Sequence, residues 1–316
     1  MVTARASRLL AIGGAHLDRR GRLAGPHIPA TSNPGRMREE VGGGVFNAAR
    51  TAARRGIAVS LLSLRGGDAA GEQVASAVEQ AGFDDLSAIF LDRATPSYTA
   101  ILDQDGELIT GLADMELYEK AFAKQLRRRK CRDAAAAADA ILCDANLPEP
   151  ALAQLVALSG TTPIHAIAVS PAKAGRLIAM FDRLATLFMN RSEARSLANL
   201  GEDASLAMTA DRLQRMGLTG GVITAGSHSV LVFADGGLWQ ITPPEVAQIA
   251  DVTGAGDALA GATIAALMHG ESLPEAARHG IAAAGLAVAS ASAAPEFDAN
   301  LFATALARVP APRAVS

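Results

Sequence analysis

Several residue types and patterns are scarce in this sequence, and each absence argues against a class of protein. Cysteine occurs only twice, at Cys131 and Cys143, too few for a disulfide framework or for a zinc site made of cysteines alone. The formal net charge is −3, so no basic excess marks a nucleic-acid binder. No apolar run reaches transmembrane length, and the run at residues 9–15 is too short for a signal-peptide core. We therefore expect a reduced, cytoplasmic protein with no nucleic-acid or membrane partner.

Aromatic residues are also scarce: they make up 4% of the 316 residues, although 50% of the chain is hydrophobic. Alanine, leucine, valine and isoleucine must therefore fill the interior. A chain of this length can bury a sizeable core and is usual for one large α/β unit. Short apolar runs alternate with helical patterns, which predicts parallel βαβ units. We expect residues 1–316 to form a single α/β domain with a mostly parallel sheet.

Three stretches do not follow the alternation of strands and helices. Residues 19–40 are rich in Gly, Pro and Arg and lack helical periodicity. Residues 97–110 predict a β-hairpin, because two runs typical of strands flank an Asp-Gly turn at residues 105–106. Residues 310–316 are typical of a loose tail.

The most informative stretch covers residues 251–258, Asp-Val-Thr-Gly-Ala-Gly-Asp-Ala, and leads into an apolar segment that ends at Met268. The pattern predicts a strand at residues 248–250, a tight glycine turn and the first turn of a buried helix. Glycines and helix amides favour a bound anion, most simply phosphate. Asp257 is then expected to remain an ionised carboxylate that can accept a proton. The alternative is a glycine turn whose aspartate only caps the helix.

A second glycine-rich stretch covers residues 41–50, Val-Gly-Gly-Gly-Val-Phe-Asn-Ala-Ala-Arg. Its glycines, Gly43 among them, allow a substrate to approach the backbone, and Asn47 offers both a hydrogen-bond donor and an acceptor. A dinucleotide-binding loop is the rival interpretation, but it needs a third glycine where Asn47 stands. The earlier Gly13-Gly14 pair also lacks that pattern. Asp18, which follows this pair, is by itself more typical of a turn residue than of a binding site.

Polar residues follow two later strands. Asn190 and Glu193 lie three residues apart at a helix start, so both side chains can face one ligand. Such oxygen ligands suit Mg²⁺, some through water, whereas the alternative is a helix cap with a glutamate three residues later. Thr224 and Gly226 follow the next predicted strand.

The two glycine-rich stretches together resemble the signatures of the ribokinase-like (phosphofructokinase-B) family of sugar and nucleoside kinases, and the resemblance extends over essentially the whole chain. It implies a ribokinase-like three-layer α/β/α fold, with a small β-sheet lid formed by about residues 17–40 and 93–112. It also implies phosphoryl transfer from ATP with Mg²⁺, and it leaves open a need for a monovalent cation such as K⁺. Because such a lid exposes sheet edges, we expect a homodimer formed through it.

The resemblance also implies a role for each matching residue. Asp257 is the expected catalytic base. The expected anion hole consists of Gly254, Ala255 and Gly256. Contacts to ATP or its phosphates, with Mg²⁺ near the first two residues, are expected from Asn190, Glu193, Thr224 and Gly226. Substrate hydroxyls are expected to contact Asp18, Gly43 and Asn47.

Further polar residues resemble those of the family members that phosphorylate pseudouridine. The candidates for lining the base pocket are Ser32, Asn33, Asn146 and Lys173. The expected reaction is therefore transfer from ATP to the 5′-hydroxyl of pseudouridine. One alternative is another sugar or nucleoside kinase of the same family, ribokinase-like or specific for purine nucleosides. A more remote alternative is a non-catalytic nucleoside-binding sensor, which would be expected to lose Asp257 or an anion-hole glycine.

Overall fold

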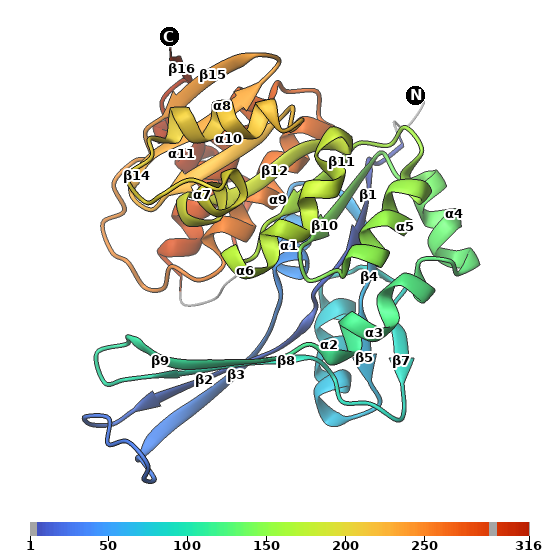
Figure 1. The fold of residues 1–316 in the computed structure, drawn as a ribbon, viewed down its shortest axis with the longest axis vertical. Coiled ribbons are helices and arrows are strands. Elements are labelled where there is room, and N and C mark those ends of the chain that lie inside the picture. Colours follow the sequence, from blue (N-terminus) through green and yellow to red (C-terminus); the bar gives the residue numbers. More distant parts are fainter. Residues whose placement is uncertain (1–4, 291–295, 316) are drawn as a thin grey trace.

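The computed structural model describes residues 5–290 and 296–315, and Figure 1 shows an α/β body from which a narrow sheet projects. Among these residues, the body contains a ten-stranded sheet in the order β16-β15-β14-β13-β12-β11-β10-β1-β4-β6. The pairs from β6 to β13 are parallel, and those from β13 to β16 are antiparallel. The strands are β1 (Arg8–Ile12), β4 (Ala58–Leu62), β6 (Asp84–Asp85), β10 (Ala140–Asp144), β11 (Ile164–Ile167), β12 (Leu184–Asn190), β13 (Gly221–Ala225), β14 (His228–Ala234), β15 (Gly237–Ile241) and β16 (Arg313–Ala314).

Helices cover both faces of this sheet, so the body has three layers (Figure 1). One face packs against α1 (Gly44–Arg54), α2 (Ala69–Gln80), α9 (Ala255–Met268), α10 (Leu273–Val288) and α11 (Ala299–Arg308). The other packs against α3 (Glu116–Gln125), α4 (Arg129–Ala137), α5 (Glu149–Ser159), α6 (Pro171–Ala174), the 3₁₀ helix η1 (Gly175–Arg183), α7 (Arg191–Ala198) and α8 (Leu206–Arg215). Within the described part of the chain, none of the helices is long and apolar enough to cross a membrane.

The alternation of side chains along β1 shows why the core divides in two. Leu9 and Ala11 point into the core beneath α1 and α9, whereas Leu10 and Ile12 point into the core beneath α3 and α5. All four side chains are at most 1% exposed, as expected for a central parallel strand buried on both faces. The predicted α/β fold with a mostly parallel sheet is confirmed.

A separate small sheet, in the order β3-β2-β8-β9, projects beside the body (Figure 1). It consists of β2 (His16–Leu23), β3 (Gly35–Gly42), β8 (Ser97–Leu102) and β9 (Leu108–Asp114). The predicted hairpin is present, because β8 pairs antiparallel with β9. Asp103 holds its turn by accepting hydrogen bonds from the amides of Asp105 and Glu107, each at 2.9 Å. A further pair, β5 (Leu64–Gly66) and β7 (Ala88–Phe90), lies at the edge of the body.

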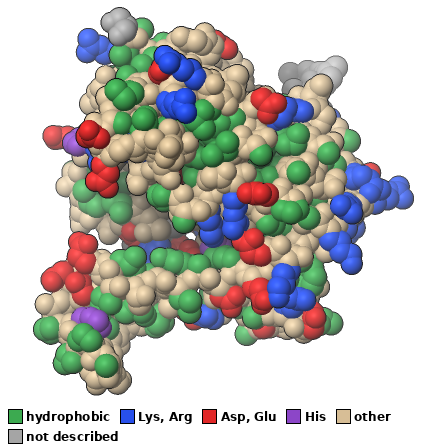
Figure 2. All heavy atoms as spheres, viewed as in Figure 1, with side chains coloured by type: hydrophobic (Ala, Val, Ile, Leu, Met, Phe, Trp, Pro, Cys, Tyr) green, Lys and Arg blue, Asp and Glu red, His purple; other side chains and the backbone are tan. Residues whose placement is uncertain are grey.

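The two faces of the small sheet make different contacts. On one face, the side chains of Met37 and Ile101 lie over Gly21. A β-carbon added at Gly21 would lie 3.2 Å from Met37 and 3.0 Å from Ile101. The other carries Asp18 and Arg20, and Arg20 pairs with Asp251 in the body. Figure 2 shows the molecule hollowed between the small sheet and the body, with charged side chains inside the hollow. This hollow lies where β1 leads into β2.

Two predicted elements near the C-terminal third are wrong. Residues 248–250 form no strand; instead the Ala250 amide donates to the Val288 carbonyl at the end of α10, so the segment pairs with a helix terminus. The tail is also more ordered than predicted, because Arg313 and Ala314 form β16 against β15. Val315 continues this contact through its amide, which donates to the Leu238 carbonyl.

Candidate active site

The glycine turn before α9 has the conformation that its sequence predicts. Gly254 caps the helix with φ of +76° and ψ of −5°, a left-handed geometry that favours glycine. The first amides of α9 belong to Ala255, Gly256 and Asp257. The Ala255 amide donates to the Val252 carbonyl at 3.4 Å, whereas those of Gly256 and Asp257 have no acceptor inside their own helix. They carry the positive end of the helix dipole. The arrangement suits an oxyanion placed against the turn.

Asp257 occupies the third position of α9 and contacts a residue of the second glycine-rich stretch. The Asn47 side-chain amide donates a 3.0 Å hydrogen bond to Asp257 Oδ2. Asn47 is on α1, and its other polar atom, Oδ1, has no hydrogen-bond partner within the described residues. A buried acceptor without a donor is costly. A substrate hydroxyl at this position would satisfy it.

The electrostatic surroundings of Asp257 differ from the sequence-based expectation. Burial raises the pKa of Asp257 to about 7, and the negative charges of Asp144, Asp18 and Glu193 add to this effect. The Asn47 hydrogen bond acts in the opposite direction. Sequence reasoning expected the helix N-terminus to keep this carboxylate ionised, and it did not anticipate the opposing effect of burial and of the neighbouring carboxylates. A pKa near 7 is instead well matched to a general base that works near neutral pH.

The glycines before α1 bring the backbone close to this carboxylate. Gly43 has φ of +113°, and a carbon added there would lie 2.3 Å from the Gly14 carbonyl oxygen. A carbon added at Gly44 would lie 3.3 Å from Asp257 Oδ1. Only glycine fits at Gly43, in space and in backbone angle. The close packing places the β1–β2 turn against the start of α1.

Asp18 lies on β2 at the base of the small sheet, beside His16, which sequence reasoning did not include among the site residues. His16 Nε2 lies 3.3 Å from Asp18 Oδ1, and the side chains of His16 and Asp18 are 7% and 19% exposed. His16 Nδ1 has no hydrogen-bond partner in the described residues. A carbon added at Gly42 would lie 2.2 Å from Asp18 Oδ2, so Gly42 leaves room for this carboxylate. The signal in the sequence was a polar residue close behind an apolar strand and two glycines, with only Ala15 between them.

A buried hydrogen-bond chain runs from Asp144 to Lys173. Asp144, at the carboxyl end of β10, is fully buried, and it accepts hydrogen bonds from the Gly14 amide at 3.1 Å and from Asn146 Nδ2 at 3.0 Å. Lys173 Nζ donates to Asn146 Oδ1 at 2.6 Å. Burial raises the pKa of Asp144 and lowers the pKa of Lys173, whose charge Asp144 in turn favours. Sequence reasoning named Asn146 and Lys173 as site residues but not Asp144.

The loop that carries Lys173 is strained at the residue where it turns. Val169 has φ of +68°, which is unusual for a β-branched side chain. The Ser170 amide donates to the Ala168 carbonyl at 2.8 Å across this tight turn, and Ser170 then caps α6. Strain of this kind is characteristic of functional sites, where surrounding structure holds it in place. Here the turn directs Lys173 toward Asn146.

The residues predicted to contact ATP lie at adjacent strand ends. Asn190 and Thr224 are register partners at the carboxyl ends of the parallel strands β12 and β13, and Gly226, with φ of +64°, follows Thr224 closely. Ligands typically bind at such carboxyl edges in α/β sheets. Asn190 and Glu193 also form a complete capping box, because Asn190 Oδ1 accepts from the Glu193 amide and Glu193 Oε2 accepts from the Asn190 amide.

This capping box bears on the predicted Mg²⁺ contact. Among the residues that the structure describes, no group of three or more His, Cys, Asp and Glu side chains could hold a metal ion. Burial raises the pKa of Glu193, and a nearby cation would favour its ionised form. The oxygen atoms of Asn190 and Glu193 therefore fit an ion that is held mainly by nucleotide phosphates and water, which is how Mg²⁺ usually binds.

Ser32 and Asn33 are not brought together with the other predicted site residues. They lie in the loop between β2 and β3, at the end of these strands opposite to Asp18 (Figure 1). Asn33 stabilises its own loop, because its side chain accepts from the Ile28 amide at 2.9 Å and donates to the Ile28 carbonyl at 2.8 Å. Their contact with a substrate stays a prediction.

An ion pair links the small sheet to the glycine turn. Arg20 Nη1, on β2, lies 2.6 Å from Asp251 Oδ2, and Asp251 Oδ1 accepts a 2.8 Å hydrogen bond from the Thr253 amide. Sequence reasoning did not anticipate this pair, because 231 positions separate its members. Through it, the strand that carries Asp18 is tied to the segment that precedes Gly254.

The chain is similar in sequence and structure to known carbohydrate kinases. The model of the pfkB family carbohydrate kinases matches residues 7–299. The chain is 30% identical to the pseudouridine kinase of Escherichia coli K12, over 78% of this chain and 80% of that protein. A carbohydrate kinase structure from Agrobacterium tumefaciens is 43% identical, with a TM-score of 0.85 over 98% of this chain and 100% of that one. Arabidopsis thaliana ribokinase, in a complex with ribose and ATP, has a TM-score of 0.84 at 20% identity over 96% and 99%.

Proposed function

Because the chain belongs to the pfkB family of carbohydrate kinases, we propose that it transfers the γ-phosphoryl group of ATP to the 5′-hydroxyl of a nucleoside, and specifically of pseudouridine. One observation carries the catalytic part of this proposal. The Asp257 carboxylate, with a pKa raised to about 7, lies at the N-terminus of α9 and is bonded to Asn47 of the second glycine-rich stretch. A proton acceptor beside an anion-binding helix terminus is what transfer from a phosphoanhydride to an alcohol requires.

In the proposed reaction, Asp257 removes the proton of the substrate 5′-hydroxyl while that oxygen attacks the γ-phosphorus. The bond from this phosphorus to the β–γ bridging oxygen breaks, ADP leaves, and the proton on Asp257 passes to solvent. The predicted anion hole of Gly254, Ala255 and Gly256, with the Asp257 amide beside it, stabilises negative charge on the transferred group. Asp18, Gly43 and Asn47 position the sugar. Mg²⁺ bound to ATP would neutralise phosphate charge, with Asn190 and Glu193 near it through water.

The assignment of ATP to the β12 and β13 ends rests on their position. Thr224 and Gly226 lie at the same sheet edge as Asp144, where β10, β12 and β13 all end. The small sheet carries Asp18 and so contributes to the substrate side of the hollow. Closure of the small sheet over a bound substrate would exclude water, which otherwise competes with the 5′-hydroxyl as phosphoryl acceptor.

The substrate proposal rests on the polar network at the ends of β10 and β11. Pseudouridine presents an N–H where uridine presents a C–H, because its base is joined to ribose through carbon. Asp144, Asn146 and Lys173 form a buried chain of donors and acceptors at this edge. An acceptor left unpaired by uridine typically costs about 1–3 kcal/mol, which is enough for strong discrimination. The likeness to the E. coli pseudouridine kinase supports the same substrate.

Release of ADP in a coupled assay tests the proposed substrate. Pseudouridine, uridine, adenosine and free ribose would be compared at equal concentrations with ATP and Mg²⁺. We expect the kcat/KM for pseudouridine to exceed that for uridine at least tenfold, which corresponds to about 1.4 kcal/mol. Equal values for the two nucleosides, or a preference for ribose, would leave the kinase assignment and remove the pseudouridine assignment.

A further inference from the structure

The ion pair between Arg20 and Asp251 brings together the two halves of the candidate active site. Alternate residues of a strand face the same side, so Arg20 projects from the same face of β2 as Asp18, two residues earlier. Arg20 Nη1 lies 2.6 Å from Asp251 Oδ2, and both side chains are 29% exposed. The strand that is proposed to hold the sugar therefore also contacts the segment before the glycine turn.

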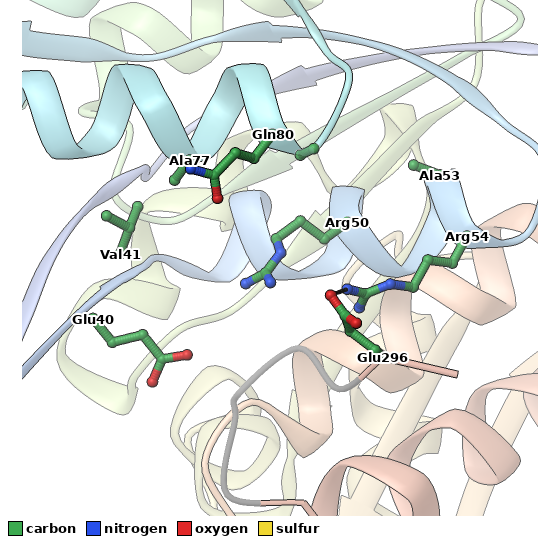
Figure 3. Close-up of a pocket in the computed structure, with 9 residues that line it drawn as sticks. Glu40, Val41, Arg50, Ala53, Arg54, Ala77, Gln80 and Glu296 are labelled. Carbon is green, nitrogen blue, oxygen red and sulfur yellow. Dashed lines mark ion pairs between the residues drawn. The ribbon is translucent and has the colours of Figure 1, made fainter. Parts of the chain in front are cut away.

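This contact lies well away from the chain connections of the small sheet. The chain enters the sheet at His16, the first residue of β2, and β3 leads through Glu40 and Val41 into α1 (Figure 3). Arg20 follows His16 by four residues, which is about 13 Å along an extended strand. A contact at that distance from the connections restricts the swing of the sheet more than a contact at its base.

The segment around Asp251 is held mainly by polar contacts. Ile249 and Val252 are each 67% exposed, so burial of apolar surface contributes little to its position. The amides of Ala250 and Asp251 both donate to the Val288 carbonyl, at 2.9 and 3.4 Å. The position of this segment should therefore respond to loss of the ion pair with Arg20.

The Asp251 carboxylate connects the ion pair to the glycine turn. Its Oδ1 accepts a 2.8 Å hydrogen bond from the Thr253 amide, while its Oδ2 contacts Arg20. A bond of this kind, from a carboxylate to an amide two residues on, fixes the backbone between them. Burial acts to raise the pKa of Asp251, but the hydrogen bonds with Thr253 and the charge of Arg20 outweigh it and lower the pKa. Asp251 is therefore ionised at neutral pH, directly before the turn at Gly254.

Electrostatic repulsion within the small sheet favours this contact with the body. In the β2–β3 register, Arg20 lies opposite Arg38, and Arg22 lies opposite Arg36. Like charges directly opposite each other destabilise a sheet. The negative charge of Asp251 offsets part of this repulsion. The small sheet is thus attracted toward the glycine turn by one of its own arginines.

From this arrangement we infer that Arg20 is a positioning residue that couples the binding of the two substrates. A sugar held by Asp18 keeps the small sheet where Arg20 contacts Asp251, and that contact sets the glycine turn for the phosphates of ATP. The inference rests on the proposed function, in which Asp18 holds the sugar and the turn binds phosphate. By linkage, each substrate then increases the affinity for the other by the same factor.

Calorimetric titration of the full-length protein tests this coupling without catalysis. The Kd of the non-hydrolysable analogue β,γ-imido-ATP with Mg²⁺ is measured with and without saturating pseudouridine. Ribose takes the place of pseudouridine if the ADP-release assay favours free sugar. In wild type, we expect the acceptor to tighten binding of the analogue about fivefold or more. In Arg20→Gln, the gain should fall below about twofold, while the Kd of the analogue alone stays close to the wild-type value.

Three further variants separate the ion pair from a general structural effect. Arg20→Lys keeps the charge and should retain part of the coupling. Asp251→Asn keeps an oxygen for the Thr253 amide but loses the charge, so it should lose the coupling. Combined with Arg20→Gln, it should lose no more than either single change. Arg19→Gln removes a pair with Glu39 on the opposite face of β2 and should behave like wild type. Melting curves establish that each variant is folded.

Several outcomes would overturn the inference. Coupling that persists in Arg20→Gln would do so, as would a wild type in which acceptor and analogue bind independently. Loss of acceptor binding in Arg20→Gln would mean that Arg20 contacts the substrate itself, which contradicts a positioning role. These outcomes leave phosphoryl transfer to pseudouridine unaffected, because the ADP-release assay measures it separately. A wild type that binds neither pseudouridine nor ribose would contradict the proposed function and, with it, this inference.

Discussion

Asn47 and Asp257 lie 210 positions apart in the sequence, yet the Asn47 amide donates a 3.0 Å hydrogen bond to the Asp257 carboxylate. The contact joins α1 to α9, and with them the two glycine-rich stretches of the chain. Burial and three neighbouring carboxylates raise the pKa of Asp257, and this hydrogen bond to the ionised carboxylate opposes them. In the proposed reaction, the pair would link substrate binding at Asn47 to proton acceptance at Asp257.

The first prediction concerns the pH dependence of the reaction. Because Asp257 must be ionised to accept a proton and its pKa is about 7, kcat/KM should rise with pH and level off above that value. Asn47→Ala removes the hydrogen bond that favours the ionised form, so the midpoint of the profile should move to higher pH. Initial rates from about pH 5 to 9 measure both midpoints. An unchanged midpoint in Asn47→Ala would contradict the assigned coupling.

The second prediction concerns stability. The pKa of Asp257 in the folded state is above the ordinary value of 3.8, so the folded protein binds this proton more tightly than the unfolded chain. The free energy of unfolding contributed by this group must then decrease as pH rises from about 4 to 7. Asp257→Asn removes the ionisable group and should be more stable than wild type at pH 8, by on the order of 1–3 kcal/mol. Urea unfolding at pH 8 and pH 4 checks this, because the difference should shrink at pH 4.

The third prediction concerns His16 and Asp18. If Asp18 holds the sugar and His16 orients it at 3.3 Å, Asp18→Asn should raise the KM for the nucleoside by more than tenfold while leaving the KM for ATP nearly unchanged. His16→Phe keeps the ring volume and removes the polar contact, so it should change the nucleoside KM in the same direction by a smaller factor. Steady-state kinetics of both variants separate the two substrates. Equal effects on both KM values would point to a disturbed fold.

The fourth prediction is dimerisation through the small sheet. Met37 and Leu112 are 53% and 70% exposed, and β3 and β9 are the edges of the small sheet. We expect light scattering to give about twice the chain mass of 32.3 kDa, and Leu112→Asp to shift the protein toward monomer. Met208→Asp, on α8, is the matched control, because Met208 is 56% exposed outside the small sheet. A wild-type monomer at micromolar concentration would contradict the prediction.

The sequence predicted those parts of the structure that depend on local pattern. The alternation of Leu9, Leu10, Ala11 and Ile12 between faces follows from strand geometry, and the turn at Gly254 follows from a residue that tolerates positive φ. The β8–β9 hairpin follows from its Asp-Gly turn. Each of these signals is contained within a few neighbouring residues.

Features that depend on contacts between distant residues could not be predicted in the same way. The strand β16 forms because Arg313 and Ala314 pair with β15, and the sequence of the tail itself contains no strand pattern that predicts this pairing. The Arg20–Asp251 ion pair and the raised pKa of Asp257 have the same origin, since burial and neighbouring charges come from the assembled fold. The position of Ser32 and Asn33 at the far end of β2 and β3 likewise follows from strand length and direction, which the motif alone does not contain.

The kinetics of Asp257→Asn test the central claim most directly. This change keeps the size of the side chain and its position on α9 but removes the proton acceptor. Loss of a general base typically costs about a hundredfold or more in rate, so we expect kcat to fall by at least that factor while nucleoside affinity, measured by calorimetry, stays within about threefold. Glu275→Gln, at a partly exposed carboxylate on α10, should retain the wild-type kcat. A kcat for Asp257→Asn within about threefold of wild type would contradict the assignment of Asp257 as the catalytic base.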